Sequence, residues 1–236
     1  MDARRQAYLD AMGIQTWAPR ASIAVSTESP PPVAAGSVGA EPLARVPVEQ
    51  LDWDALRAEV AACQRCALAE TRTQTVFGVG DPRADLLIVG EAPGADEDRL
   101  GEPFVGRAGQ LLNLMLQAIG LRREQVYIAN ILKCRPPGNR DPRAEEAAHC
   151  RPFLLRQIAL IEPRLILSVG RISAQNLLHS DEAVGRLRGR VHRFPETDTP
   201  LIVTYHPAYL LRSPEQKAKA WDDLQRVHRI LHGRDA

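Results

Sequence analysis

Four short apolar runs stand out along the chain, and each ends at, or just before, a glycine or a polar residue. They cover residues 85–90, 126–132, 165–170 and 201–204. Their apolar character is continuous rather than alternating, which is typical of strands buried on both faces of a parallel sheet. The pattern therefore predicts a sheet of four strands that is mainly parallel.

Amphipathic segments alternate with these runs. In residues 107–119, for example, Leu111, Leu112, Met115 and Leu116 fall on one helical face. Strands that alternate with helices predict an α/β fold in which helices cover both faces of a parallel sheet. The predicted helices are residues 51–62, 107–119, 143–161 and 214–231.

The first fifth of the chain has a different composition. Residues 19–48 are rich in Pro, Ser, Gly and Ala, which predicts a disordered linker. Residues 1–18 contain a short amphipathic island in which Tyr8, Leu9 and Met12 share a helical face. Because so short an island does not fold alone, we interpret it as a partner-binding peptide. We assign residues 49–236 to one domain.

The chain begins Met-Asp-Ala-Arg-Arg and contains no apolar run of the length that a signal peptide or membrane span requires. We therefore expect a cytoplasmic protein without membrane association, and a monomer. The formal net charge of +1 excludes a uniformly basic coat for nucleic acid but leaves room for a local basic surface.

The chain has four cysteines, Cys63, Cys66, Cys134 and Cys150. The Cys63-Gln64-Arg65-Cys66 spacing lets two thiolates reach one metal centre, and the fold must bring the other two. In a reducing cytosol these cysteines are more plausibly metal ligands than disulfides. Zinc and a 4Fe-4S cluster both accept four thiolates, and four buried thiols acting as small apolar groups are the remaining alternative.

Polar residues follow three of the predicted strands. Glu91 comes after the first strand, Asn130 lies at the end of the second, and His206 comes after the fourth. Each has an ordinary explanation on its own, as a helix cap, a turn residue or a loop histidine. Because the carboxyl ends of parallel strands form the ligand site of such folds, we expect the three together to mark a functional site. The Lys-Ser/Thr of a P-loop is absent, which disfavours a nucleoside triphosphatase.

Several separated motifs then agree with one family. GEAPGADED at 90–98, PFVGRAGQLL at 103–112, NILKCRPPGNRDP at 130–142 and HPAYLLR at 206–212, with the four cysteines in this order, resemble the family 4, iron-sulfur uracil-DNA glycosylases. The resemblance implies a three-layer α/β/α fold, excision of uracil from DNA, and a 4Fe-4S cluster held by the four cysteines. The cluster would be structural, tying the first predicted helix and the basic loop after Asn130 to the helix that bears Cys150.

The resemblance also implies roles for pocket residues. Phe104 would lie flat on the uracil ring, or else be ordinary core. Asn130 can donate to uracil O4 and accept from N3–H, a pairing that cytosine would reverse. His206 would donate a hydrogen bond to O2 as the uracil anion forms.

Two acidic residues border this predicted pocket. Other glycosylase families carry an aspartate two residues after the position of Glu91, and Ala92 and Pro93 supply no carboxylate here. Either Glu91 orients the attacking water, or the reaction proceeds mainly by charge stabilisation. Glu97 would obstruct the methyl group of thymine, or else be a solvated residue at a helix start.

DNA contact is expected from the loops at the strand ends. The HPAYLLR loop resembles one that enters the minor groove, with Leu210 as the apolar wedge and Arg212 on a phosphate. The alternative for Leu210 and Leu211 is the core of the last helix. Further backbone contacts are expected from Arg107, Arg135, Asn139 and Arg140.

Two rival functions remain. A glycosylase that bonds covalently to the sugar through a loop histidine is disfavoured, because residues 133–141 contain no histidine. An inactive iron-sulfur scaffold is disfavoured by the presence of Phe104, Asn130 and His206. Residues 4–17 keep the scaffold idea open, because they resemble the N-terminal peptide of the psi subunit of the replicative clamp loader, which would make a clamp-loader ATPase subunit a partner. The alternative is that this island packs on its own domain.

Overall fold

The computed structural model describes residues 46–233. The predicted partner-binding peptide and almost all of the predicted linker lie outside the described residues. Within residues 46–233, no helix is long and apolar enough to cross a membrane.

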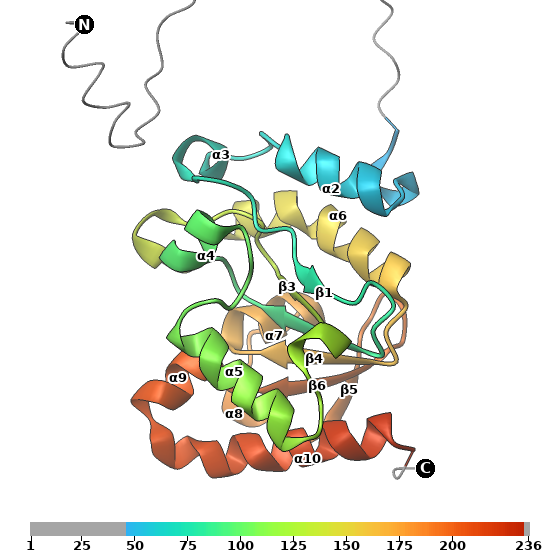
Figure 1. The fold of residues 1–236 in the computed structure, drawn as a ribbon, viewed down its shortest axis with the longest axis vertical. Helices are drawn as coiled ribbons and strands as arrows, with labels where there is room; N and C mark the ends of the chain where they lie inside the picture. Colours follow the sequence, from blue (N-terminus) through green and yellow to red (C-terminus); the bar gives the residue numbers. More distant parts are fainter. Residues whose placement is uncertain (1–45, 234–236) are drawn as a thin grey trace, which may run out of the picture. The chain divides into compact units, whose positions relative to one another are not determined.

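The described chain forms a six-stranded sheet with the order β1-β3-β2-β4-β6-β5 (Figure 1). The four central strands are parallel, and the edge strands β1 and β5 run antiparallel to their neighbours. The strands are β1 (Val79–Gly80), β2 (Leu86–Gly90), β3 (Tyr127–Asn130), β4 (Leu165–Val169), β5 (Val191–Arg193) and β6 (Pro200–Thr204).

The predicted parallel strands are confirmed, but the predicted strand count of four is corrected to six. The two additional strands span two and three residues and are not fully buried. Neither carries the apolar run by which a central strand is recognised, because an edge strand needs only backbone pairing on one side.

Helices connect the strands. They are α2 (Trp53–Ala61), α3 (Leu68–Thr71), α4 (Ala95–Leu100), α5 (Arg107–Ala118), α6 (Ala144–Ile161), α7 (Arg171–Leu178), α8 (Val184–Leu187), α9 (Pro207–Arg212) and α10 (Lys217–Leu231). Four short 3-10 turns, η1 (Val48–Gln50), η2 (Arg123–Gln125), η3 (Pro137–Asn139) and η4 (Pro214–Gln216), complete the order.

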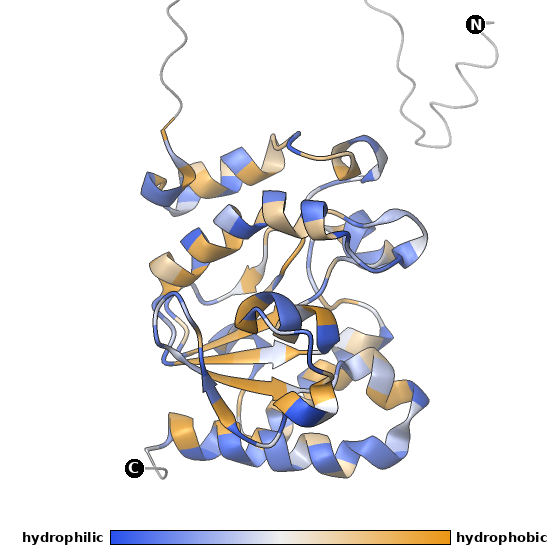
Figure 2. Cartoon of the chain, turned by 180° about the vertical axis from the view of Figure 1, so that it is seen from behind, coloured by the Kyte–Doolittle hydropathy of each residue, from blue (hydrophilic) through white to orange (hydrophobic). Residues whose placement is uncertain are grey.

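The sheet separates two apolar cores, so the three-layer α/β/α fold is confirmed. Leu87 and Val89 of β2 face the core under α6 and α7, whereas Leu86 and Ile88 face the core under α5 and α10. This alternation explains why the strand sequences are continuously apolar, and Figure 2 shows the strands as almost uniformly hydrophobic.

A third, smaller core joins α2 to α6. Leu56 and Val60 of α2 pack with Phe153 of α6 and with Phe77. Asp52 begins α2 by accepting a hydrogen bond from the Ala55 amide at 2.9 Å. The helix is therefore fixed against the outer side of α6, and its end delivers the first cysteine pair.

A buried ion pair connects α8 to α10. Arg188 donates to both carboxylate oxygens of Asp223 at 3.0 Å, and the Asp223 side chain is fully buried. Arg188→Ala would leave that carboxylate without its partner, so we expect the free energy of unfolding to fall by about 3–5 kcal/mol. Urea unfolding at pH 7 measures this, with Arg190→Ala as control because its ion pair with Glu182 is exposed. Equal midpoints for the two variants would contradict the prediction.

Candidate functional site

A pocket of about 800 Å³ opens at the carboxyl ends of the central strands. It is lined by residues that follow β2, β4 and β6, by Asn130 at the end of β3, and by the segment between α4 and α5. The sequence-predicted residues Glu91, Ala92, Glu97, Phe104, Asn130 and His206 all line it. The structure therefore brings together, in one cavity, every residue that was predicted to bind the base.

Asn130 supplies an unsatisfied acceptor to this pocket. Its side chain is 2% exposed, and among the described residues its Oδ1 atom has no hydrogen-bond partner. Gly90 makes room for it, because a Cβ at Gly90 would lie 2.4 Å from Asn130 Oδ1 and 2.7 Å from the Phe104 ring. An orphaned buried carbonyl costs free energy until a ligand donates to it. Asn130 is thus prepared to accept an N–H from a flat ligand.

The backbone of Asn130 is held by a polar network that sequence reasoning missed. Lys133 is buried and donates to the Asn130 carbonyl at 3.0 Å and to Gln157 Oε1 at 2.6 Å. Gln157 in turn donates to the Phe77 carbonyl at 2.9 Å. Burial lowers the pKa of Lys133 to about 8. A lysine within an otherwise apolar stretch was the signal that could have revealed this network.

His206 presents one defined proton to the pocket. It precedes α9, whose first residue is Pro207, and its Nδ1 atom accepts a hydrogen bond from the Ala208 amide at 3.1 Å. An acceptor Nδ1 places the proton of the neutral ring on Nε2. Burial, followed by the charge of Arg212, lowers the pKa of His206 to about 4, and the charge of Glu97 opposes the shift. His206 is therefore a neutral hydrogen-bond donor at physiological pH.

Phe104 lies across the pocket from His206, with ring centroids 5.5 Å apart and an interplanar angle of 30°. The residue is 7% exposed; it lines the pocket and also packs into a core, and its stacking on a base stays a prediction. Its φ of +54° is left-handed, which costs about 1–3 kcal/mol for a bulky side chain. Neighbouring groups must supply that free energy.

Glu97 has a role that the sequence did not reveal. Its Oε1 atom accepts hydrogen bonds from the Val105 and Gly106 amides at 3.0 and 3.2 Å, and its Oε2 atom accepts from Gly94 at 3.1 Å. The carboxylate therefore binds three backbone amides, and it is neither a freely solvated group nor only a steric barrier. Whether it also excludes a methyl group stays a prediction.

Glu91 is a second ionisable group of this pocket whose pKa is strongly shifted. Burial is the main cause that raises its pKa, the Asp141 carboxylate adds to the rise, and Arg171 opposes it, with a result of about 7. Arg171 is paired with Asp141 at 2.5 Å. Neither Arg171 nor Asp141 was predicted as a site residue, and only the folded chain brings them near Glu91.

The predicted DNA-binding residues behave differently from one another. Arg107 and Arg212 are exposed, and Arg212 borders the pocket. Arg135 donates to Asn139 Oδ1 at 2.7 Å. Leu210 is 1% exposed and packs in the core beside α5 and α10, so its prediction as the wedge is wrong. Its neighbour Leu211 is 38% exposed and points out of that core.

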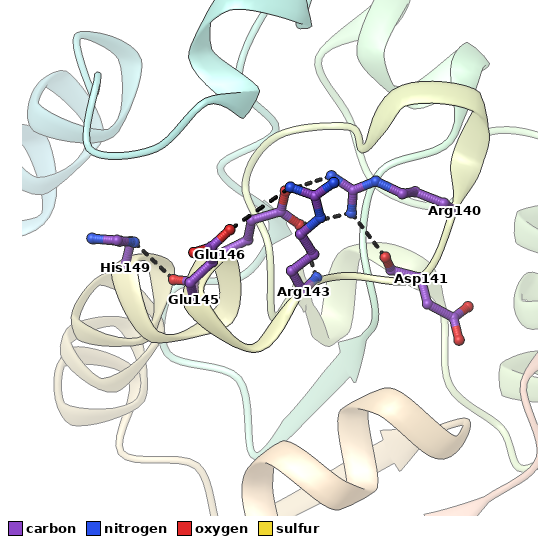
Figure 3. Close-up of polar contacts among 6 residues, drawn as sticks. All are labelled: Arg140, Asp141, Arg143, Glu145, Glu146 and His149. Carbon is purple, nitrogen blue, oxygen red and sulfur yellow. Dashed lines mark hydrogen bonds and ion pairs between the residues drawn. The ribbon is translucent and has the colours of Figure 1, made fainter.

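Arg140 is committed within the protein. Figure 3 shows its guanidinium beside Glu146 of α6, to which it donates at 2.9 and 2.5 Å, and it also donates to the Asp141 carbonyl at 2.9 Å. Glu146 further accepts from the Arg143 amide at 2.8 Å. The pair closes the loop between Cys134 and Cys150, so Arg140 serves the shape of that loop.

The four cysteines come from three segments of the chain. Within residues 46–233 all four thiols are free, and Cys134 and Cys150 are buried. The pKa of Cys134 is raised first by burial, and the charges of Cys66 and Cys63 add to the rise. Burial likewise raises the pKa of Cys150 to about 12, with contributions from Cys134 and Cys66. Cys66 therefore acts on the pKa of both Cys134 and Cys150, which come from two other segments of the chain.

Arg72 connects two of these segments. It donates to the Cys134 sulfur at 3.1 Å and to the Cys63 carbonyl at 2.7 Å. In the part of the chain that the structure describes, no three His, Cys, Asp or Glu side chains converge closely enough to hold one metal ion. A single zinc with bonds of about 2.3 Å requires its sulfurs to lie about 3.8 Å apart, whereas a cluster binds each thiolate through a separate iron and accepts a wider spacing.

Comparisons with known proteins agree with this site. The uracil DNA glycosylase superfamily matches residues 77–225. A type-4 uracil-DNA glycosylase of Archaeoglobus fulgidus is 44% identical over 76% of this chain and 92% of its own length. A type-4 enzyme of Thermotoga maritima is 41% identical over 73% of this chain and 91% of its own length. A type-5 uracil-DNA glycosylase of Thermus thermophilus is 34% identical over 52% of this chain and 64% of its own length.

The matched family region begins well after the N-terminal island. None of these relatives supports the resemblance of residues 4–17 to the clamp-loader psi subunit, which stays a prediction from the sequence. The match does contain the pocket and two of the four cysteines, Cys134 and Cys150. The chain belongs to the uracil-DNA glycosylase superfamily.

Proposed function

We propose that this chain excises uracil from DNA by hydrolysing its N-glycosidic bond, which leaves an abasic site and begins base excision repair. The carrying observation is the unpartnered Asn130 Oδ1 in a pocket that also holds Phe104 and the neutral His206. An inactive scaffold has no need for this combination. The names of the type-4 relatives support the same reaction.

Recognition requires that the base leave the duplex, because its glycosidic bond is not accessible within the stack. In the pocket, Asn130 Oδ1 would accept from uracil N3–H while its amide nitrogen donates to O4. Cytosine presents an acceptor and a donor in the opposite order, so it would leave the buried Oδ1 unsatisfied. Phe104 would stack on the ring and fix its plane.

Bond cleavage leaves negative charge on the base and positive charge on the sugar. The Nε2–H of His206 would donate to uracil O2 as that negative charge develops, an interaction that is strongest where water is excluded. Because the pKa of His206 is about 4, the ring would act as a neutral donor and would not protonate the base. Glu91, in its ionised form, would hold the attacking water and stabilise the cationic sugar.

DNA would be held at the rim of the pocket. Arg212 and Arg107 are exposed and can reach phosphates, and Arg135 and Asn139 present a polar loop beside them. We assign the wedge to Leu211, since it is the exposed member of the Leu210–Leu211 pair. Arg140 would act indirectly, by holding its loop through Glu146.

We propose that the four cysteines hold a 4Fe-4S cluster. The donor set fits, because it consists of four free thiols, two of them buried, and because Arg72 donates to the Cys134 sulfur and to the Cys63 carbonyl and so joins two of the segments that bear them. When bound, the cluster supplies a covalent tie between the end of α2, the loop after β3, and α6. The reaction pocket is built from other residues, so the role is structural.

Single-turnover release of uracil from a labelled oligonucleotide tests the reaction. Wild type should produce abasic DNA, His206→Ala should be slower by about 10²–10³-fold, and Asn130→Ala by about 10–10²-fold because one base-reading residue is lost. Asn176→Ala and His232→Ala are matched controls that lie outside the pocket, at equal cluster content. Wild type that binds DNA but releases no base would instead favour the scaffold.

The pH profile of the same step tests the role of Glu91. Since the ionised carboxylate is the active form and its pKa is about 7, the single-turnover rate should rise about tenfold per pH unit below 7 and level off above it. Glu91→Gln should be slow and should lose this inflection. Asp141 and Arg171 also act on the pKa of Glu91, so both residues are left unchanged in this experiment. A flat wild-type profile between pH 5.5 and 8.5 would exclude Glu91 as the base.

Elemental analysis tests the cluster. Protein purified without oxygen should contain about four iron and about four sulfide per chain, with broad visible absorption. Cys134→Ser should lower both contents and lower the urea midpoint, because the tie between segments is lost. One zinc per chain without sulfide would overturn the assignment.

A further inference from the structure

The segment around Phe104 is held in a conformation that its own residues do not favour. Positive φ among the described non-glycine residues occurs at Phe104, Asn139, Glu162, His179 and Asp198. Glu162 and His179 end helices, where a left-handed residue is common, and Asn and Asp tolerate this region. Phe104 has neither reason, so the surroundings must impose its conformation.

Glu97 holds the amide side of this segment, as its Oε1 atom accepts from the Val105 and Gly106 amides. The carbonyl side is held by Arg123, which lies at the start of η2, between α5 and β3. Arg123 donates through Nη2 to the Pro103 carbonyl at 2.5 Å and through Nη1 to the Phe104 carbonyl at 3.4 Å. Its Nη1 atom also reaches Asn113 Oδ1 of α5 at 3.4 Å.

We infer that Arg123 is a positioning residue that fixes the Phe104 ring for stacking on the base. This inference rests on the proposed function. Two opposite charges grip the segment from its two sides, so residues 103–106 cannot rotate about the Phe104 backbone without breaking charge-assisted hydrogen bonds. The planar guanidinium suits this task, because one rigid fork reaches two successive carbonyls.

The helix beneath the segment limits any alternative position. A Cβ at Gly109 would lie 1.7 Å from the Phe104 carbonyl oxygen, so α5 approaches this carbonyl as closely as glycine allows. Gly90 lies on the other side, where a Cβ would meet the ring at 2.7 Å. The ring is therefore enclosed by β2, and its carbonyl by α5 and Arg123. A stacking platform requires a fixed position, because a displacement of about 1 Å can cost about 10²-fold in rate.

Arg123 acts at a distance from the base. It is absent from the described residues that line the pocket and is partly buried; burial lowers its pKa, and the charges of Glu102, Glu124 and Glu97 oppose that shift. Its effect on the reaction must therefore pass through Phe104. A residue that only anchored η2 would instead act on folding in general.

A double-mutant cycle distinguishes the two roles. Arg123→Met should lower kcat/KM on uracil-containing DNA by about 10–10²-fold, with inhibition by free uracil weakened in proportion. In a Phe104→Ala background the same substitution should change kcat/KM by less than about threefold, because the group through which it acts is gone. Arg123→Lys should fall between, since an ammonium cannot span both carbonyls in one plane.

Arg122→Met is the matched control, because Arg122 is the exposed neighbour, and it should leave kcat/KM unchanged. If Arg123→Met fails to fold, the cycle is run with Arg123→Lys. Equal losses in the wild-type and Phe104→Ala backgrounds, or a loss of melting temperature without a change in uracil inhibition, would overturn the inference. Failure of the proposed function is distinct, since wild type would then release no uracil.

Discussion

The register between β2 and β3 is the constraint on which the site depends. Gly90 pairs with Asn130 across these parallel strands, so both strands end at the same level and their last residues face each other. A slip of one residue would turn the Asn130 side chain to the opposite face of the sheet. Every residue of β2 is buried, with Leu86 and Ile88 in one core and Leu87 and Val89 in the other, so a slip of β2 would also move each of these side chains to the opposite core.

Side chains and amides near these strand ends then hold the residues that line the pocket. Lys133 and Gln157 hold the Asn130 backbone from behind, and Glu97 and Arg123 hold the Phe104 segment from its two sides. The Ala208 amide donates to Nδ1 of His206, which places the proton of the neutral ring on Nε2. Lys133 and Gln157 are buried, whereas Glu97 and Arg123 are only partly buried. Lys133, Glu97 and Arg123 each hydrogen-bond backbone atoms, so neighbouring side chains fix the segments that carry the pocket residues.

The proposed cluster site is built on the same strand and helices that position the pocket. Cys134 follows β3 directly and Cys150 lies in α6, so the β3 segment that ends at Asn130 leads into the proposed cluster site within four residues. Arg140 and Glu146 close the loop between them, and Arg72 joins the first cysteine pair to Cys134. The proposed cluster and the pocket would thus be adjacent along the chain, although they are built from different side chains.

The sequence by itself determined the central strands, the main helices, the polar residues at the strand ends and the set of thiols. These follow from periodicity and from residue type at a strand end, which are local properties. Only the tertiary structure decided that Leu210 is buried while Leu211 is exposed, that Arg140 is committed to Glu146, and that β1 and β5 add edges to the sheet. It also decided the pKa of Glu91, which burial raises first, with a further rise from Asp141 and an opposing effect from Arg171. Those outcomes depend on side-chain direction and on partners from other segments, and neither is specified until the chain has folded.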